Sequence, residues 1–281
     1  MSDGNGGGLA ASMTGGGRVT PLPLRLYRVA RTGVHLLEGV ATTTLVFPLI
    51  TPTARRKAIR GWSRRLLRML NVDARLHGEP AVGGNVLIVA NHVSWLDIFV
   101  LNAVSPVRFV AKAELSRWPV AGRLIRDVGT LFVERERRRD ARRVNGHAAA
   151  ALARGDVVAV FPEGTTTDGT ALLPFKSSLL QPIVDARGRV QPMAIRYRAA
   201  NGEPSRAPAY VGDDSFLASF WRVTGARSLV VDLHAPPALA AGGSHRRELA
   251  RSAEAAIRTV LEAVPVATAP GTRAGRGGGS P

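Results

Sequence analysis

Six short apolar runs constrain the fold of this chain more than any other feature of its sequence. Several of them are apolar at consecutive positions, which is typical of strands that are covered on both faces. Helical or loop stretches separate the runs, so the sequence predicts an α/β fold with a single mixed, mainly parallel sheet flanked by helices. The predicted strands span residues 85–90, 107–112, 130–134, 156–161, 190–197 and 228–233.

The first of these strands leads directly into a polar turn, residues 91–97, with the sequence Asn-His-Val-Ser-Trp-Leu-Asp. Ser94 and Asp97, three positions apart, match a capping box, so a helix is expected to begin at Ser94. His92 then lies on the turn between strand and helix, where residues that face ligands collect in open α/β sheets.

The spacing between His92 and Asp97 decides whether their side chains can meet. Five residues apart on one helix, they would point about 140° away from each other. If His92 precedes the helix and Asp97 lies in its first turn, the imidazole can fold back onto the carboxylate. The carboxylate would then fix the tautomer and leave the other ring nitrogen as a general base. The alternative is a histidine that merely ends a turn beside a structural aspartate, and these residues alone leave both open.

The net charge and the composition limit the kinds of partner that the chain can bind. The 281 residues carry a formal net charge of +17, which indicates nucleic acid, an anionic membrane face or phosphorylated substrates. Aromatic residues make up only 5% of the chain and do not alternate with the basic runs, so nucleic acid is not expected. The absence of cysteine excludes disulfides, thiolate metal sites and a cysteine acyl-enzyme. The six histidines show no metal-binding spacing, and no metal or other cofactor is expected.

The region before the predicted sheet is typical of a membrane anchor. Residues 39–54 are uncharged but number only 16, short of the roughly 20 that a spanning helix needs. Basic residues flank this stretch on both sides. The positive-inside rule therefore favours a re-entrant or interfacial anchor over a simple span.

The helix expected over residues 55–70 is amphipathic and has two interpretations. It lies on anionic lipid headgroups with Trp62 at the boundary, or it packs its apolar side on the following domain. The apolar stretch that precedes it favours lipid. Its apolar positions are Ile59, Trp62, Leu66 and Met69, and its basic positions are Lys57, Arg60, Arg64 and Arg68.

Three further stretches carry residues that could bind a substrate near the ends of predicted strands. Lys112 and Arg135 each end a predicted strand, where a cation could hold an anionic headgroup. Arg135 also opens a run of mixed charge, so a solvated helix face is the alternative for it. In residues 161–165, Phe-Pro-Glu-Gly-Thr, Gly164 lets the backbone approach a substrate closely, and Glu163 can accept hydrogen bonds from a hydroxyl group.

Together these motifs resemble those of the lysophospholipid acyltransferase family, whose best-known members are 1-acyl-glycerol-3-phosphate acyltransferases. The family pattern is N-H-x4-D, then G-x-x-F-x-x-R, then F-P-E-G-T, followed by an apolar strand with proline. All occur here in this order, over about residues 75–200. The matching positions are Asn91, His92 and Asp97, then Gly129, Phe132 and Arg135, then residues 161–165 and 190–195.

The resemblance implies acyl transfer at the cytoplasmic face of the inner membrane, whose anionic lipids are an expected partner. His92, oriented by Asp97, would take the proton from the free hydroxyl of a lysolipid. The oxygen would then attack the thioester of acyl-CoA or acyl carrier protein, without a covalent intermediate or a metal. The residues implied to bind the acceptor are Lys112, Arg135, Glu163, Gly164 and Thr165.

The sequence is compatible with two different lipids as the acyl acceptor. Many relatives have Arg after Glu-Gly-Thr, whereas this chain has Thr166. Lysophosphatidic acid is the first expectation, and the missing cation leaves room for another lysolipid such as lyso-ornithine lipid. A basic module that binds polyanions or membranes without catalysis is the alternative of a different class, and the ordered motifs favour the enzyme.

The sequence therefore predicts an organisation in five parts. These are a disordered tail (1–20), membrane-anchoring helices (21–71), an acyltransferase α/β domain (72–235), a C-terminal helix (236–265) and a second disordered tail (266–281).

Overall fold

The computed structural model of the protein describes residues 20–81, 83–117, 121–133 and 138–263. The predicted tails lie almost wholly outside these residues. The strands are β1 (Val72–His77), β2 (Val86–Ala90), β3 (Arg108–Lys112), β4 (Leu131–Val133), β5 (Val157–Val160), β6 (Arg189–Ala199), β7 (Leu229–His234) and β8 (Leu239–Ala240). The α-helices are α1 (Leu22–Ala41), α2 (Pro52–Met69), α3 (Leu96–Val104), α4 (Ala121–Asp127), α5 (Arg138–Ala153), α6 (Gln181–Asp185), α7 (Phe216–Gly225) and α8 (Arg246–Ala263). Short helical turns are η1 (Thr42–Val46), η2 (Phe47–Leu49), η3 (Ala113–Arg117) and η4 (Ser177–Leu180).

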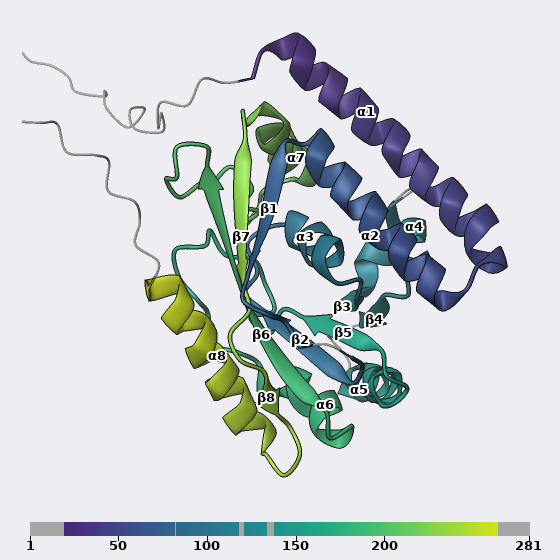
Figure 1. The fold of residues 1–281 in the computed structure, drawn as a ribbon, viewed down its shortest axis with the longest axis vertical. Helices are drawn as coiled ribbons and strands as arrows, with labels where there is room; N and C mark the ends of the chain where they lie inside the picture. Colours follow the sequence, from purple (N-terminus) through teal and green to yellow (C-terminus); the bar gives the residue numbers. More distant parts are fainter. Residues whose placement is uncertain (1–19, 82, 118–120, 134–137, 264–281) are drawn as a thin grey trace, which may run out of the picture.

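The described strands form one sheet in the order β1-β7-β6-β2-β5-β3-β4, and β8 pairs with β6 (Figure 1). Only the pairings of β6 with β7 and with β8 are antiparallel within it. The prediction of a mixed, mainly parallel sheet is confirmed. The predicted strands did not include β1 and β8. β1 lies at the edge of the sheet, where Asp73, Arg75 and His77 interrupt its apolar residues, and β8 has two residues.

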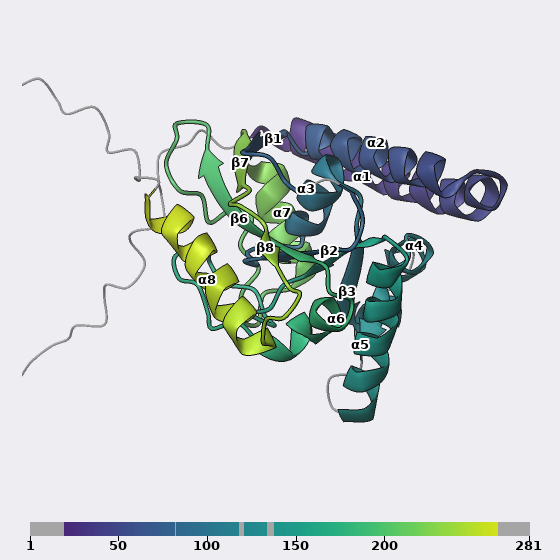
Figure 2. The same cartoon turned by 60° about the horizontal axis from the view of Figure 1, so that its bottom comes forward.

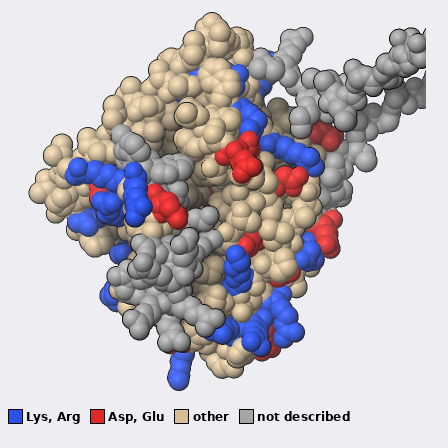
Figure 3. All heavy atoms as spheres, turned by 180° about the vertical axis from the view of Figure 1, so that it is seen from behind, with Lys and Arg blue, Asp and Glu red and all other residues tan. Residues whose placement is uncertain are grey.

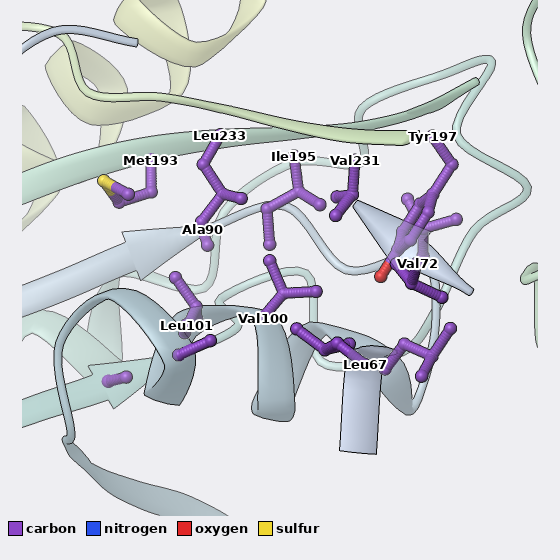
Figure 4. Packing of buried hydrophobic residues seen from close by; sticks show 14 of the residues in the cluster. Leu67, Val72, Ala90, Val100, Leu101, Met193, Ile195, Tyr197, Val231 and Leu233 are labelled. Carbon is purple, nitrogen blue, oxygen red and sulfur yellow. The ribbon is translucent and has the colours of Figure 1, made fainter. Parts of the chain in front are cut away.

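β2 shows why the apolar runs are continuous. Val86, Ile88 and Ala90 belong to a cluster on the side of the sheet covered by α2 and α3. Leu87 and Val89 belong to a second cluster, with residues of α5, α6 and α8. Figure 4 shows side chains of β6 and β7 packed against those of α3 in the first cluster. Both faces of the strand are therefore buried.

β6 is longer than the neighbours that it joins. Its first half, Arg189 to Met193, pairs with β2, and its second half, Ala194 to Ala199, pairs with β7. The second half therefore continues past the point where β2 ends. This places the end of β6 beside the turn that follows β2.

α1 and α2 form a helical hairpin and lie side by side in Figures 1 and 2. α1 carries an inverted pattern of burial, because its buried residues include Arg28, Thr32 and His35 while its large apolar residues are exposed. From behind, the top of the molecule, where α1 and α7 lie, presents a mainly uncharged surface with a few Lys or Arg atoms (Figure 3). The exposed apolar residues of the hairpin are Leu22, Leu24, Leu26, Tyr27, Val34, Leu37, Leu45, Val46 and Leu49.

The expectation that the apolar side of α2 rests on lipid is wrong, because this side packs on the rest of the protein. Leu66 and Leu67 are buried in the cluster shared with α3. Trp62 lies under α1, where its ring stacks on His35 at 4.4 Å and its Nε1 donates to the His35 carbonyl at 3.1 Å. The basic positions of α2, Lys57, Arg60, Arg64 and Arg68, are exposed. No helix among the described residues is both long enough and apolar enough to cross a membrane.

Candidate active site

The side chain of Asn91 extends the pairing of β2 and β6 by one step. Its Nδ2 donates to the Ile195 carbonyl at 2.9 Å, and its Oδ1 accepts from the Ile195 backbone N–H at 2.7 Å. The Asn91 side chain thus satisfies both backbone hydrogen-bonding groups of Ile195. The backbone of the chain is free to leave the sheet and turn at His92.

His92 and Asp97 are in direct contact. Nδ1 of His92 lies 2.8 Å from Oδ2 of Asp97, whose side chain is fully buried, while the His92 side chain is 20% exposed. Asp97 lies in the first turn of α3 and His92 precedes the helix, as the folded-back geometry requires. Oδ2 also accepts from the backbone N–H groups of Val93 and Ser94 at 2.8 and 2.9 Å. The second is the backward half of a capping box, although α3 begins at Leu96 rather than at Ser94.

Tyr197 of β6 holds the other oxygen of Asp97. The buried phenol donates to Oδ1 at 2.7 Å, across 100 residues of sequence. Burial, and next the nearby charge of Asp97, raise the pKa of Tyr197 well above its ordinary value, so the hydroxyl remains a donor. The sequence places Tyr197 at the end of a predicted strand but in no motif, and nothing in it indicates this partner.

Phe161 supports the imidazole from one side. The two rings are stacked, with centroids 3.9 Å apart and planes 8° from parallel. Phe109 lies behind Phe161 at 6.0 Å. Within the described part of the chain no hydrogen-bond partner contacts Nε2 of His92, which leaves this nitrogen for a substrate proton.

Glu163 stabilises the turn that contains His92. Its Oε1 accepts from the backbone N–H of His92 at 2.7 Å, and its Oε2 accepts from that of Leu173 at 2.9 Å. Burial raises the pKa of Glu163, and the two backbone hydrogen bonds oppose that rise. The carboxylate therefore fixes the loop of residues 161–176 to the histidine. Its contact with an acceptor lipid stays a prediction.

The loop also brings a cation that the sequence pattern did not indicate. Gly164 has φ of +77°, and any side chain there would collide with the ammonium of Lys176. Lys176 thus lies against the Phe-Pro-Glu-Gly-Thr turn, while Thr165 is exposed. The hydroxyl of Thr166 is committed to the carbonyl of Tyr210. The positive φ favours glycine at 164, and the absence of a side chain there leaves room for Lys176.

The two cations predicted at strand ends are only partly located. Lys112 is the last residue of β3, where it pairs with Val133 of β4, but its side chain lies outside what the structure describes. Arg135 lies outside the described residues altogether. Their part in binding a headgroup stays a prediction.

Known proteins match this chain in sequence and in fold. Residues 72–196 match the family model described as Acyltransferase. The 1-acyl-sn-glycerol-3-phosphate acyltransferase of Neisseria meningitidis is 37% identical over 213 residues, which cover 75% of this chain and 83% of that protein. The lyso-ornithine lipid O-acyltransferase of Pseudomonas aeruginosa is 39% identical over 212 residues, which cover 75% and 81%.

A solved structure shares the architecture. The crystal structure of the 1-acyl-sn-glycerophosphate (LPA) acyltransferase PlsC from Thermotoga maritima has a TM-score of 0.65 and 23% identity, and the match covers 86% of this chain and 94% of that one. Fold and family model together define the class, an α/β acyltransferase of lipid biosynthesis. More particularly, the chain belongs to the lysophospholipid acyltransferase family.

Tyr197→Phe tests how Asp97 is held. The substitution leaves Oδ1 without its donor, and a hydrogen bond to a charged group contributes about 1.5–3 kcal/mol. We expect kcat to fall about tenfold or more, with KM for both substrates nearly unchanged, because only the orientation of His92 is affected. Tyr210→Phe is the matched control, since no described residue bonds to its hydroxyl. Unchanged kcat, or a change in KM alone, would contradict this role.

Glu163→Gln tests the buried carboxyl through pH. Its pKa is raised above the ordinary 4.5 in the folded chain. Its contribution to stability is therefore fully present below about pH 4.5 and is lost as the pH rises through the folded pKa. We expect the free energy of unfolding of the native chain, relative to the variant, to fall as the pH rises from 4.5. Urea denaturation across this range measures it, with Glu79→Gln as an exposed control. A difference that grows with pH would be the opposite result.

Proposed function

We propose that the chain transfers a fatty acyl group from acyl-CoA or acyl carrier protein to the free hydroxyl of a lysolipid. The first acceptor is 1-acylglycerol 3-phosphate, and the product is then phosphatidic acid. The observation that carries the proposal is the 2.8 Å contact of His92 with the buried Asp97. It supports a base whose tautomer is set at Nδ1 and whose Nε2 is left to receive a proton.

The proposed reaction needs only this pair and the two substrates. Nε2 of His92 takes the hydroxyl proton as the acceptor oxygen attacks the thioester carbonyl. The C–S bond then breaks, and the thiolate leaves with the proton that the imidazolium returns. Asp97 supports the imidazolium without taking the proton itself, and a positioned base of this kind contributes about 10²–10⁴ in rate.

The proposed acceptor site lies along the loop that crosses His92. Lys112 and Arg135 are proposed to hold the acceptor phosphate, and Glu163, Gly164 and Thr165 to line the site. Lys176 adds a cation against Gly164. This placement supports a phosphate-bearing acceptor even though position 166 carries no arginine.

Lyso-ornithine lipid is the second candidate acceptor. Thr166 replaces the arginine of many relatives, and its hydroxyl is committed to the Tyr210 carbonyl. The Pseudomonas aeruginosa relative, 39% identical, is a lyso-ornithine lipid O-acyltransferase. An acceptor without a phosphate monoester would need fewer cations at this loop.

We also propose that the helical hairpin docks the enzyme on the cytoplasmic face of the inner membrane. The exposed apolar residues of α1, η1 and η2 support an interfacial anchor rather than a span. α7 extends this surface with Leu217 and Trp221, both exposed. The guanidinium of Arg25 lies 3.6 Å over the Trp221 ring and joins α1 to α7.

His92→Ala is the direct test of the proposed reaction. With labelled acyl-CoA or acyl carrier protein and a panel of lysolipids, the native enzyme is expected to form diacyl product, and the variant to lose at least about 10²-fold in kcat. His147→Ala, at an exposed position on α5, is the matched control and should retain activity. The lipid that is turned over with the highest kcat/KM identifies the acceptor. Folded native protein without turnover on any lysolipid would instead leave a basic binding module.

Leu49→Glu tests the membrane surface. Leu49 is 84% exposed in the turn between α1 and α2, so the change costs no core packing. Burial of such a side chain in lipid contributes about 1.5–3 kcal/mol, and we expect affinity for phosphatidylcholine vesicles to fall about tenfold. Leu76→Glu, at a 40% exposed position on β1, is the control. Equal losses in the two variants in a vesicle flotation assay would count against docking through the hairpin.

A further inference from the structure

A groove between α1 and α2 gathers four positive charges. It has a volume of about 360 Å³ and is lined by Arg28 and Arg31 of α1 and by Arg65 and Arg68 of α2. No carboxylate is among the residues that line it. None of the proposed catalytic or acceptor-binding residues belongs to it either. The groove is therefore a separate, cationic site.

Arg28 is a buried cation without an anionic partner in the described structure. Its side chain is 8% exposed. Its hydrogen bonds to described residues all leave from Nη1 and reach neutral oxygens, on Thr20, Thr224 and Ala226. Burial lowers its pKa, which reflects the cost of keeping this charge away from water. Nε and Nη2 make no hydrogen bond to a described residue, and an anion bound by Arg28 would offset that cost.

The other three arginines are held by weak contacts that an anion can replace. Arg31 donates to the Tyr27 hydroxyl at 2.8 Å, and Arg68 donates to a backbone carbonyl at 3.4 Å. Arg65 pairs with Glu38 at 3.5 Å, where both side chains are half exposed. Exposed pairs of this kind contribute only about 0–1 kcal/mol. The positive charge of the groove is thus little compensated.

The position of the groove indicates which anion it receives. Leu24 and Tyr27 line it and also belong to the exposed apolar surface of the hairpin. An occupant would therefore meet cations and an apolar surface together, as a phospholipid does. Guanidinium groups bind phosphate oxygens in a bidentate geometry, and the volume lies within the range of small-ligand sites.

We propose that this groove binds the phosphate headgroup of an anionic phospholipid, with the acyl chains lying along the outer face of α1. The proposal rests on membrane docking by the hairpin, and it adds a lipid-selective contact to that docking. The site would retain the enzyme on anionic membranes independently of substrate turnover.

Paired substitutions separate the groove from general surface charge. Arg31→Ala with Arg68→Ala removes two positive charges from the groove. Lys57→Ala with Arg60→Ala removes two from exposed positions of the same hairpin outside it. Binding is measured by flotation with phosphatidylcholine vesicles, with and without phosphatidylglycerol. We expect the groove pair to lose about tenfold more of the phosphatidylglycerol-dependent affinity than the control pair.

The outcomes are distinct from those of the proposed function. Equal losses in the two pairs, or native binding that ignores phosphatidylglycerol, overturn the groove as a headgroup site. Turnover by the native enzyme is measured separately and is untouched by either result. A Leu49→Glu variant that binds neutral vesicles normally removes the docking surface itself, and the proposal with it.

A cysteine placed in the groove tests occupancy directly. The chain contains no cysteine, so Met69→Cys gives a unique thiol among the lining residues. Gly61→Cys, at an exposed position on α2 with open space around it, is the control. We expect monomeric dihexanoyl-phosphatidylglycerol to slow maleimide labelling of Cys at 69 at least about threefold, and not at 61. No slowing at 69, or equal slowing by inorganic phosphate at the same concentration, overturns the lipid assignment.

Discussion

The buried carboxylate of Asp97 is the interaction on which the rest of the site depends. Described donors from two parts of the chain meet on it: the imidazole of His92 and the backbone of Val93 and Ser94 in the turn, and the phenol of Tyr197 in β6. A fully buried carboxylate is costly unless its oxygens are satisfied. Asp97 thereby joins the turn after β2, the first turn of α3 and the second half of β6. Hydrogen bonds in such a network support one another, so geometry at the histidine depends on all of them.

The sequence predicted the α/β fold and the mixed sheet, because runs and turns leave a local signal. The spacing of His92 and Asp97 only permitted their contact, and the resemblance to a family implied it. The sequence missed Tyr197, since a tyrosine at the end of a strand has no pattern that names a partner 100 residues away. It missed Lys176 for a similar reason, because only the folded loop brings that residue against Gly164. α2 was interpreted wrongly, since an amphipathic helix with a basic side has the same sequence whether lipid or protein covers its apolar side.

The two helices of the hairpin have opposite patterns of burial, whereas a single amphipathic helix was expected to combine apolar and basic surface. α2 uses its apolar residues on the domain and leaves its basic ones exposed. α1 does the reverse, burying Arg28 and His35 and exposing leucines. Buried polar groups are costly unless they are hydrogen-bonded, as Arg28 and His35 are. Exposed apolar patches are typical of surfaces that contact a partner. The pair of helices thus exposes apolar residues on α1 and basic residues on α2.

The extension of β6 past β2 has a consequence for how the enzyme matures. The turn of residues 91–97 is held at both ends only after Asn91 has bonded to Ile195 and Asp97 has bonded to Tyr197. Contacts of such long sequence separation close late, because the loop entropy must be overcome first. During synthesis the N-terminal hairpin is complete long before the last residues of β6 leave the ribosome. A chain at this stage would already expose the apolar residues of its hairpin. The bonds from β6 that hold the turn with His92 and Asp97 in place would not yet have formed.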